Sequence, residues 1–134
     1  MPHVVIQYSA NLEPLVDIPA LCKEFATALV ALQAEDGKAL FPIGGTRVLA
    51  YPAQHYAVAD AKGDYAFCYI NLRIAAGRSE AMKKKTGDSL LALAQARFAT
   101  AFEKHPVGVT LQIDEAAGQV YDAKHSNLHP LFGK

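Results

Sequence analysis

The stretch that decides the fold is residues 65–80, YAFCYINLRIAAGRSE. Its first part, residues 65–74, is rich in aromatic and branched side chains, which favour a β-strand. A glycine-containing turn then leads to Ser79, a residue type that commonly caps the N-terminus of a helix. Apolar residues recur at helical spacing behind this cap, and residues 107–114, VGVTLQID, have the composition of another strand. This half of the chain therefore predicts a strand, a helix and a second strand.

The first half of the chain has the same order. Residues 4–9 read as a strand, and Asp17 stands where the N-cap of a helix belongs. Apolar residues at helical spacing indicate that this helix continues to about Ala34. Residues 46–51 then read as the next strand. The first half therefore also predicts a strand, a helix and a strand.

Corresponding positions in the two halves stand at a nearly constant offset, because Asp17 matches Ser79 and the strand residue Arg47 matches Thr110. Such an offset indicates a duplicated βαβ unit, in which a right-handed crossover makes the two strands parallel. Two units related by a pseudo-twofold axis form a four-stranded mixed sheet with both helices on one face. The predicted fold class is therefore α/β (α+β), with the first strands of the two units antiparallel neighbours.

The length predicts one domain over residues 1–134, large enough to bury a core without disulfides or metal. Repeat one covers about 2–60 and repeat two about 61–120, and a C-terminal tail of about 121–134 is apolar enough to dock on a neighbouring subunit. The second face of the sheet would be apolar and bare in a single chain. Packing against other copies of the chain is the simplest way to bury this face, so we expect an oligomer.

Composition excludes several classes of partner. Lysine and arginine balance aspartate and glutamate at 13 each, which removes the electrostatic argument for a nucleic-acid or anionic-membrane partner. No apolar stretch is long enough to span a bilayer, and the N-terminus lacks the pattern of a signal peptide. Cys22 and Cys68 have no redox or zinc spacing and read as free thiols. We therefore expect a reduced, cytoplasmic protein.

Pro2 directly precedes the first strand, and this position has two interpretations. A proline is tolerated as the first residue of a strand, where its missing N–H costs no ladder hydrogen bond. If Met1 is removed, however, Pro2 presents a free secondary amine. An α-amino group titrates at about 7.7–8.0, and burial disfavours its charged form, so a buried terminal proline can be a general base at neutral pH. A retained Met1 would make the same nitrogen a tertiary amide without basicity.

Two arginines are candidates for binding a carboxylate. Arg78 sits on a glycine-containing turn at a helix N-terminus, where backbone N–H groups and the helix dipole favour an anion. Its alternative role is pairing with Glu80 or another surface acid. Antiparallel pairing of the first strands of the two repeats would bring Arg78 close to Pro2. Arg47 follows a pair of glycines at the start of a strand, and its alternative is a solvated arginine at a strand edge.

Metal binding is not expected. His125 and His129 have the i, i+4 spacing of helical ligands, but no HExxH pattern and no third ligand accompany them in the sequence. No other pattern of residues points to a cofactor.

Together these residues resemble 5-carboxymethyl-2-hydroxymuconate isomerase, of the tautomerase superfamily that also holds 4-oxalocrotonate tautomerase and macrophage migration inhibitory factor. The resemblance covers essentially the whole chain. Its most specific parts are MPH at residues 1–3, FPIGGTR at 41–47, DYAF at 64–67 and IAAGRS at 74–79, and the tail NLHPLF at 127–132 adds to it. The sequence departs from the family's pattern after Arg47, where VLAYP replaces a more basic and aromatic stretch.

The resemblance implies a cofactor-independent homotrimer that isomerises 2-hydroxymuconate-like carboxylated dienols in aromatic-compound catabolism. It implies that Pro2 is the proton-transferring base and that Arg47 and Arg78 bind carboxylates of a small-molecule substrate. The alternative is a non-catalytic trimer that keeps the tautomerase fold as an interaction protein, which a retained Met1 would enforce.

Overall fold

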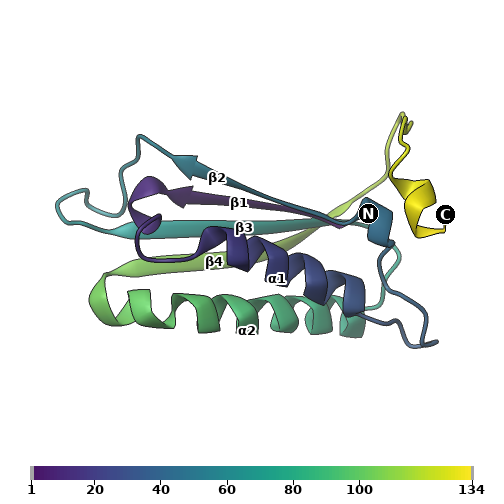
Figure 1. The fold of residues 1–134 in the computed structure, drawn as a ribbon, viewed down its shortest axis with the longest axis horizontal. Coiled ribbons are helices and arrows are strands. Elements are labelled where there is room, and N and C mark those ends of the chain that lie inside the picture. The colour runs from purple at the N-terminus through teal and green to yellow at the C-terminus, as the bar shows by residue number, and fades with distance from the viewer. Residues whose placement is uncertain (1, 134) are drawn as a thin grey trace.

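The computed structural model describes residues 2–133, which form one mixed β-sheet and two long helices (Figure 1). The strands and helices are, in chain order, β1 (His3–Ser9), α1 (Ile18–Ala31), β2 (Arg47–Ala53), β3 (Ala66–Ala75), α2 (Glu80–Lys104) and β4 (Val107–Ala116). Short 3₁₀ turns are η1 (Ala10–Leu12), η2 (Ile43–Gly45) and η3 (His129–Phe132).

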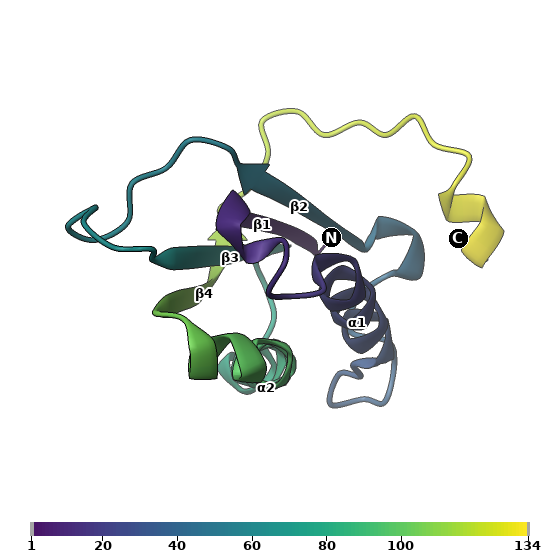
Figure 2. The ribbon, with the colours of Figure 1, turned by 60° about the vertical axis from the view of Figure 1, so that its left-hand side comes forward.

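The sheet has the order β2-β1-β3-β4 and confirms the predicted mixed topology. β1 pairs with β2 and β3 pairs with β4 in parallel, whereas β1 and β3 are antiparallel. Both helices lie on one face of the sheet, as Figure 2 shows. The N-terminal end of β1 and the C-terminal end of β3 therefore meet at the same end of the molecule.

The helix N-termini form where the capping residues predicted them. The Asp17 carboxylate accepts the N–H of Ala20 at 3.1 Å, and the Ser79 hydroxyl accepts the N–H of Met82 at 3.2 Å. The first helix is shorter than expected, because Leu32 is already extended and its carbonyl accepts the N–H of Leu40 at 2.9 Å. This pairing across the loop replaces the last predicted helical turn.

The core lies between the sheet and the two helices. Alternate residues of β1 and β3 point into it, as the two-residue period of a strand requires. One side of each helix covers them. The core side chains with almost no exposed surface include Val4, Ile6, Leu21, Phe25, Leu29, Ile70, Leu72, Leu90 and Phe98. Burial of this apolar surface is the main stabilising contribution to the fold.

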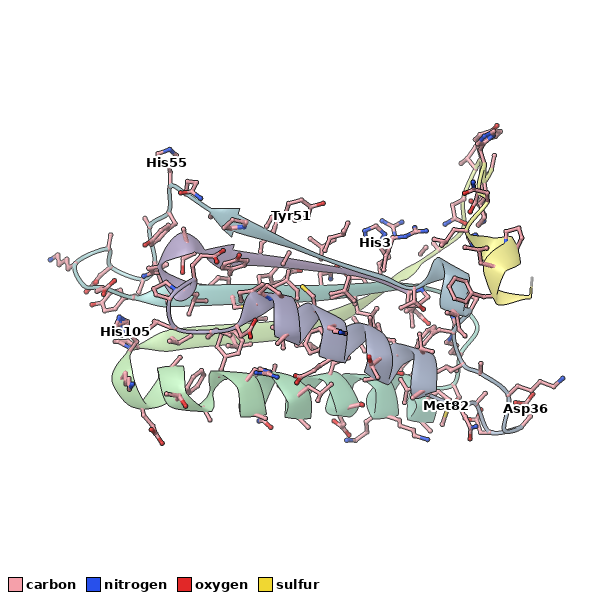
Figure 3. The ribbon with its side chains drawn as sticks, viewed as in Figure 1. His3, Asp36, Tyr51, His55, Met82 and His105 are labelled. Carbon is pink, nitrogen blue, oxygen red and sulfur yellow. The ribbon has the colours of Figure 1, made fainter. Side chains whose placement is uncertain are left out.

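The opposite face of the sheet, which we call the open face, carries the other half of each strand. Figure 3 shows His3 and Tyr51 on this side, away from the helices. The face is bare, but it is not uniformly apolar as the sequence suggested. Its aromatic part holds exposed Tyr51 and Phe67, whereas basic side chains gather where β1 and β2 begin and β3 ends. The strand register determines which side chains lie next to one another in each part, and composition does not reveal that register.

The C-terminal tail runs away from the sheet as an extended segment and ends in η3 (Figures 1 and 2). η3 packs against η2 of the same chain, where the backbone of His129 approaches Gly44 so closely that an added Cβ would lie 3.0 Å from the His129 Cα. Docking of the tail on a neighbouring subunit stays a prediction. Within residues 2–133, neither helix is long and apolar enough to cross a membrane.

Candidate functional site

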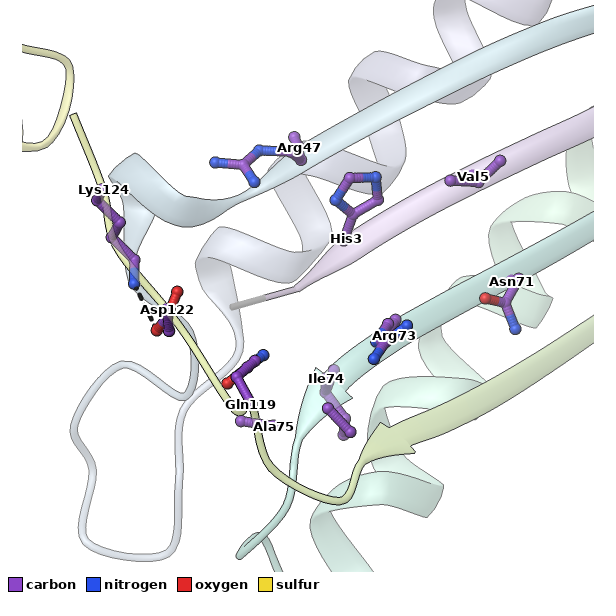
Figure 4. A pocket seen from close by; sticks show the side chains of 11 residues that line it. His3, Val5, Arg47, Asn71, Arg73, Ile74, Ala75, Gln119, Asp122 and Lys124 are labelled. Carbon is purple, nitrogen blue, oxygen red and sulfur yellow. Dashed lines mark hydrogen bonds and ion pairs between the residues drawn. The ribbon is translucent and has the colours of Figure 1, made fainter. Parts of the chain in front are cut away.

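A cavity of about 560 Å³ opens on the open face where β1 begins (Figure 4). Three strands form its floor, and the tail after β4 forms one wall. The polar and charged side chains that line it are His3, Arg47, Asn71, Arg73, Gln119, Asp122 and Lys124. The charged side chains of the cavity are therefore mostly basic, and apolar residues such as Val5 and Ile74 complete the lining.

Strand register brings three of these side chains into one row. His3 is the direct partner of Arg47 in the parallel ladder with β2 and of Arg73 in the antiparallel ladder with β3. Directly paired residues point to the same face of a sheet with their Cβ atoms about 4.5–5.5 Å apart. The imidazole of His3 consequently lies between the two guanidinium groups, and all three line the cavity.

The arginines of this row have no acidic partner in the part of the chain that the structure describes. Asp114 is opposite Arg73 in the ladder with β4, but its carboxylate accepts the side-chain N–H of Asn71 at 2.8 Å. Asp122 is paired with Lys124 at 3.0 Å. Burial, together with the charges of Arg47 and Arg73, lowers the pKa of His3 from its usual value of 6.5. The row therefore offers two cationic forks on either side of a neutral imidazole.

Pro2 is buried and directly precedes His3 at the start of β1. Its carbonyl accepts the backbone N–H of Arg47 at 3.3 Å, which fixes Pro2 beside the beginning of β2. A residue of a strand spans about 3.3 Å, so the Pro2 backbone lies within a few ångströms of the basic row.

Arg78 has other surroundings. Its guanidinium donates to the carbonyl oxygens of Ala75 and Leu40, both at 3.1 Å, and stacks 4.5 Å from the centre of the Phe41 ring. Burial lowers the pKa of the Arg78 guanidinium, but an arginine in a protein stays charged at neutral pH. Arg78 does not line the cavity that Arg47 lines. The structure therefore does not bring the two predicted arginines together in one cavity of a single chain.

The alternative role of Arg78, pairing with Glu80, is not observed either, because Glu80 pairs with Lys83 at 2.6 Å. Arg78 is instead held by hydrogen bonds from its two terminal nitrogens to backbone carbonyls. The carboxylate-binding role of Arg78 stays a prediction.

Sequence reasoning missed His3 and Arg73 as residues of this site. The available signal was the alternation along two strands that were themselves predicted, combined with the predicted antiparallel pairing of those strands. Within residues 2–133, no group of three or more histidine, cysteine, aspartate or glutamate side chains is placed to hold a metal ion. His129, one of the pair with ligand spacing, has its Nδ1 3.1 Å from the Ser126 hydroxyl.

Comparisons with known proteins agree along the whole chain. The sequence model of the 5-carboxymethyl-2-hydroxymuconate isomerase family matches residues 2–132. A 5-carboxymethyl-2-hydroxymuconate Delta-isomerase of Escherichia coli is 29% identical over 132 residues, which are 98% of this chain and 99% of the relative.

Solved structures give the same result. A crystal structure of a 5-carboxymethyl-2-hydroxymuconate delta-isomerase is 48% identical with a TM-score of 0.92, covering 100% of this chain and 94% of that chain. A 5-carboxymethyl-2-hydroxymuconate isomerase from Deinococcus radiodurans R1 is 36% identical with a TM-score of 0.86, covering 99% and 95%.

More distant structures share the fold alone. A macrophage migration inhibitory factor-like protein from Entamoeba histolytica is 16% identical with a TM-score of 0.55, over 93% of this chain and 96% of that one. A protein described as a fused 4-OT symmetric trimer is 13% identical with a TM-score of 0.55, over 91% and 93%. The predicted tautomerase-like fold is thereby confirmed.

Proposed function

The chain belongs to the 5-carboxymethyl-2-hydroxymuconate isomerase family, and on this basis we propose that it is a cofactor-independent tautomerase of carboxylated 2-hydroxymuconate-like dienols. The family and the named relatives are isomerases, so isomerisation is the reaction class. The observation that carries the proposal for the substrate is the basic row of the cavity, which lies one residue from Pro2. Unpaired arginine forks suit carboxylates, which accept two parallel hydrogen bonds.

In the proposed reaction, Pro2 becomes a terminal secondary amine after removal of Met1. The neutral amine takes a proton from the dienol hydroxyl, or from carbon, and returns it further along the conjugated system. No atom is gained or lost overall. Burial of Pro2 favours the neutral form that a base needs.

Arg47 and Arg78 are proposed to hold substrate carboxylates and to stabilise the charge that moves toward the oxygen end in the transition state. Arg47 is already in the cavity next to Pro2. Arg78 uses two of its five N–H donors on the Ala75 and Leu40 carbonyls, which leaves donors for a substrate carboxylate.

The test compares the processed protein with a variant that keeps one residue ahead of Pro2. Intact mass first establishes whether Met1 has been removed, and loss of 2-hydroxymuconate absorbance at neutral pH measures turnover. We expect the blocked protein to keep its circular dichroism spectrum and to lose turnover, because its Pro2 nitrogen is an amide. Equal rates for the two proteins would mean that Pro2 is not the base and serves only as a structural residue at the start of the strand. Full retention of Met1 in the native host would favour the non-catalytic alternative.

A further inference from the structure

The charges in the proposed substrate outnumber the arginines assigned to them. Muconate is a dicarboxylate, and the carboxymethyl group in the name of the family's substrate adds a third carboxylate. Arg47 and Arg78 account for two. An unpaired third carboxylate in a cavity loses part of its hydration, so a third cation is needed nearby.

The cavity contains one cation that suits this need. Arg73 lies on the open face beside His3, and no carboxylate of the described residues holds its guanidinium. Lys124 is less suitable because it is already paired with Asp122 at 3.0 Å. Asp114, the acid closest to Arg73 in register, is held by Asn71.

We propose that Arg73 and His3 form a subsite for the third carboxylate, so that Arg73 sets the preference of the enzyme for tricarboxylate over dicarboxylate dienols. This inference rests on the proposed function. The Arg73 fork binds both carboxylate oxygens, and the His3 ring donates one further N–H to the same group. The neutral His3 adds a hydrogen bond without competing for the charge of the arginines.

The first experiment measures kcat/KM for 5-carboxymethyl-2-hydroxymuconate and for 2-hydroxymuconate with the wild type and Arg73→Ala. Loss of a charge-assisted pair is expected to lower the ratio of the two kcat/KM values by roughly 10- to 100-fold, mainly through KM. Arg73→Lys should recover part of this ratio, since the charge remains and the fork is lost. A ratio that Arg73→Ala leaves at the wild-type value would overturn the inference while the proposed function stands.

Arg97→Ala is the matched control. Arg97 pairs with Glu24 between the two helices, on the other side of the sheet, so its removal takes away the same charge far from the cavity. The substrate ratio of this variant should equal that of the wild type. An equal fall of the ratio in both variants would indicate a general effect of net charge and contradict the subsite.

A second experiment does not need turnover. Calorimetric titration with the non-reactive probes tricarballylate and glutarate compares three carboxylates with two. We expect tighter binding of tricarballylate to the wild type and loss of this preference in Arg73→Ala. A preference that disappears in the variant supports the subsite even if the protein turns over neither dienol, in which case only the proposed reaction fails. Equal binding of both probes by wild type and variant would contradict the subsite.

Discussion

Pro2 directly precedes β1, and its proposed chemistry depends on one nitrogen atom. Burial and the neighbouring basic row both disfavour a protonated amine there. We therefore expect kcat/KM to rise with pH through an apparent pKa below the peptide value of about 7.7–8.0. The measurement is a pH-rate profile of the processed protein. Pro2→Ala keeps a primary amine of different basicity, so its profile should shift and its rate should fall without vanishing.

His3 supplies an independent prediction about the same end of the molecule. Its lowered pKa should appear in an NMR titration as a midpoint below 6.5, and Arg73→Ala should move that midpoint upward by removing one repelling charge. Because the unfolded chain then binds the proton more readily than the folded one, His3 contributes stability that is present above pH 6.5 and is lost as pH falls through the folded pKa. A midpoint at or above 6.5 would contradict the arrangement of the row.

Arg78 is expected to have two effects that can be separated. Arg78→Ala should lower kcat/KM for a carboxylated dienol by about 10²-fold if the guanidinium holds a carboxylate. It should also lower stability by about 1–3 kcal/mol because the Leu40 carbonyl loses its donor. Urea unfolding and steady-state kinetics measure the two effects. Reduced stability with unchanged kinetics of the folded enzyme would leave Arg78 only its structural role.

At the level of the elements, the helix of each βαβ unit begins with an N-cap side chain that accepts a backbone N–H. Asp17→Ala removes the acceptor of the Ala20 N–H and should cost about 1 kcal/mol in urea unfolding. Asp17→Asn is the matched control, since asparagine caps as well as aspartate, and it should cost much less. An equal loss in both variants would mean that the charge of Asp17, not its hydrogen bond, stabilises α1.

Ser79 makes a further contact that Asp17 lacks. Its hydroxyl accepts the Met82 N–H and donates to Glu35 at 2.7 Å, which ties the start of α2 to the loop after α1. The Glu35 carboxylate consequently has a pKa below its usual value, chiefly through this hydrogen bond. The N-terminus of α2 in the second repeat is therefore tied to the first repeat. We propose that the boundary between the two repeats of this single domain lies at about residues 60 and 61.

At the scale of the whole molecule, we propose that three copies assemble through the open face. Tyr51 and Phe67 are exposed there in a single chain, and the tail adds exposed Leu131 and Phe132. Light scattering should return three times the 14.4 kDa chain mass at micromolar concentration. A stable monomer would contradict the proposal.

The tail makes this prediction more specific. Deleting residues from Asn127 onward should weaken the assembly if η3 docks on a neighbouring subunit. In the single chain, η3 packs on η2 beside Gly44. If that contact is the only one the tail makes, the deletion should lower Tm and leave the molar mass at that of the trimer.

The sequence alone determined the elements and their order, because caps, helical spacing and strand composition act between residues close in the chain. It also determined the mixed sheet, since a βαβ crossover makes the strands of each unit parallel and the duplicated pattern indicated a pseudo-twofold axis between the units. Only the tertiary structure placed Arg73 beside His3 and gave Arg78 its contacts with Leu40 and Phe41. These neighbours are far apart in the chain, and a shift of one residue in strand register would send Arg73 to the opposite face. Local signals do not contain that register, because packing of the whole core selects it.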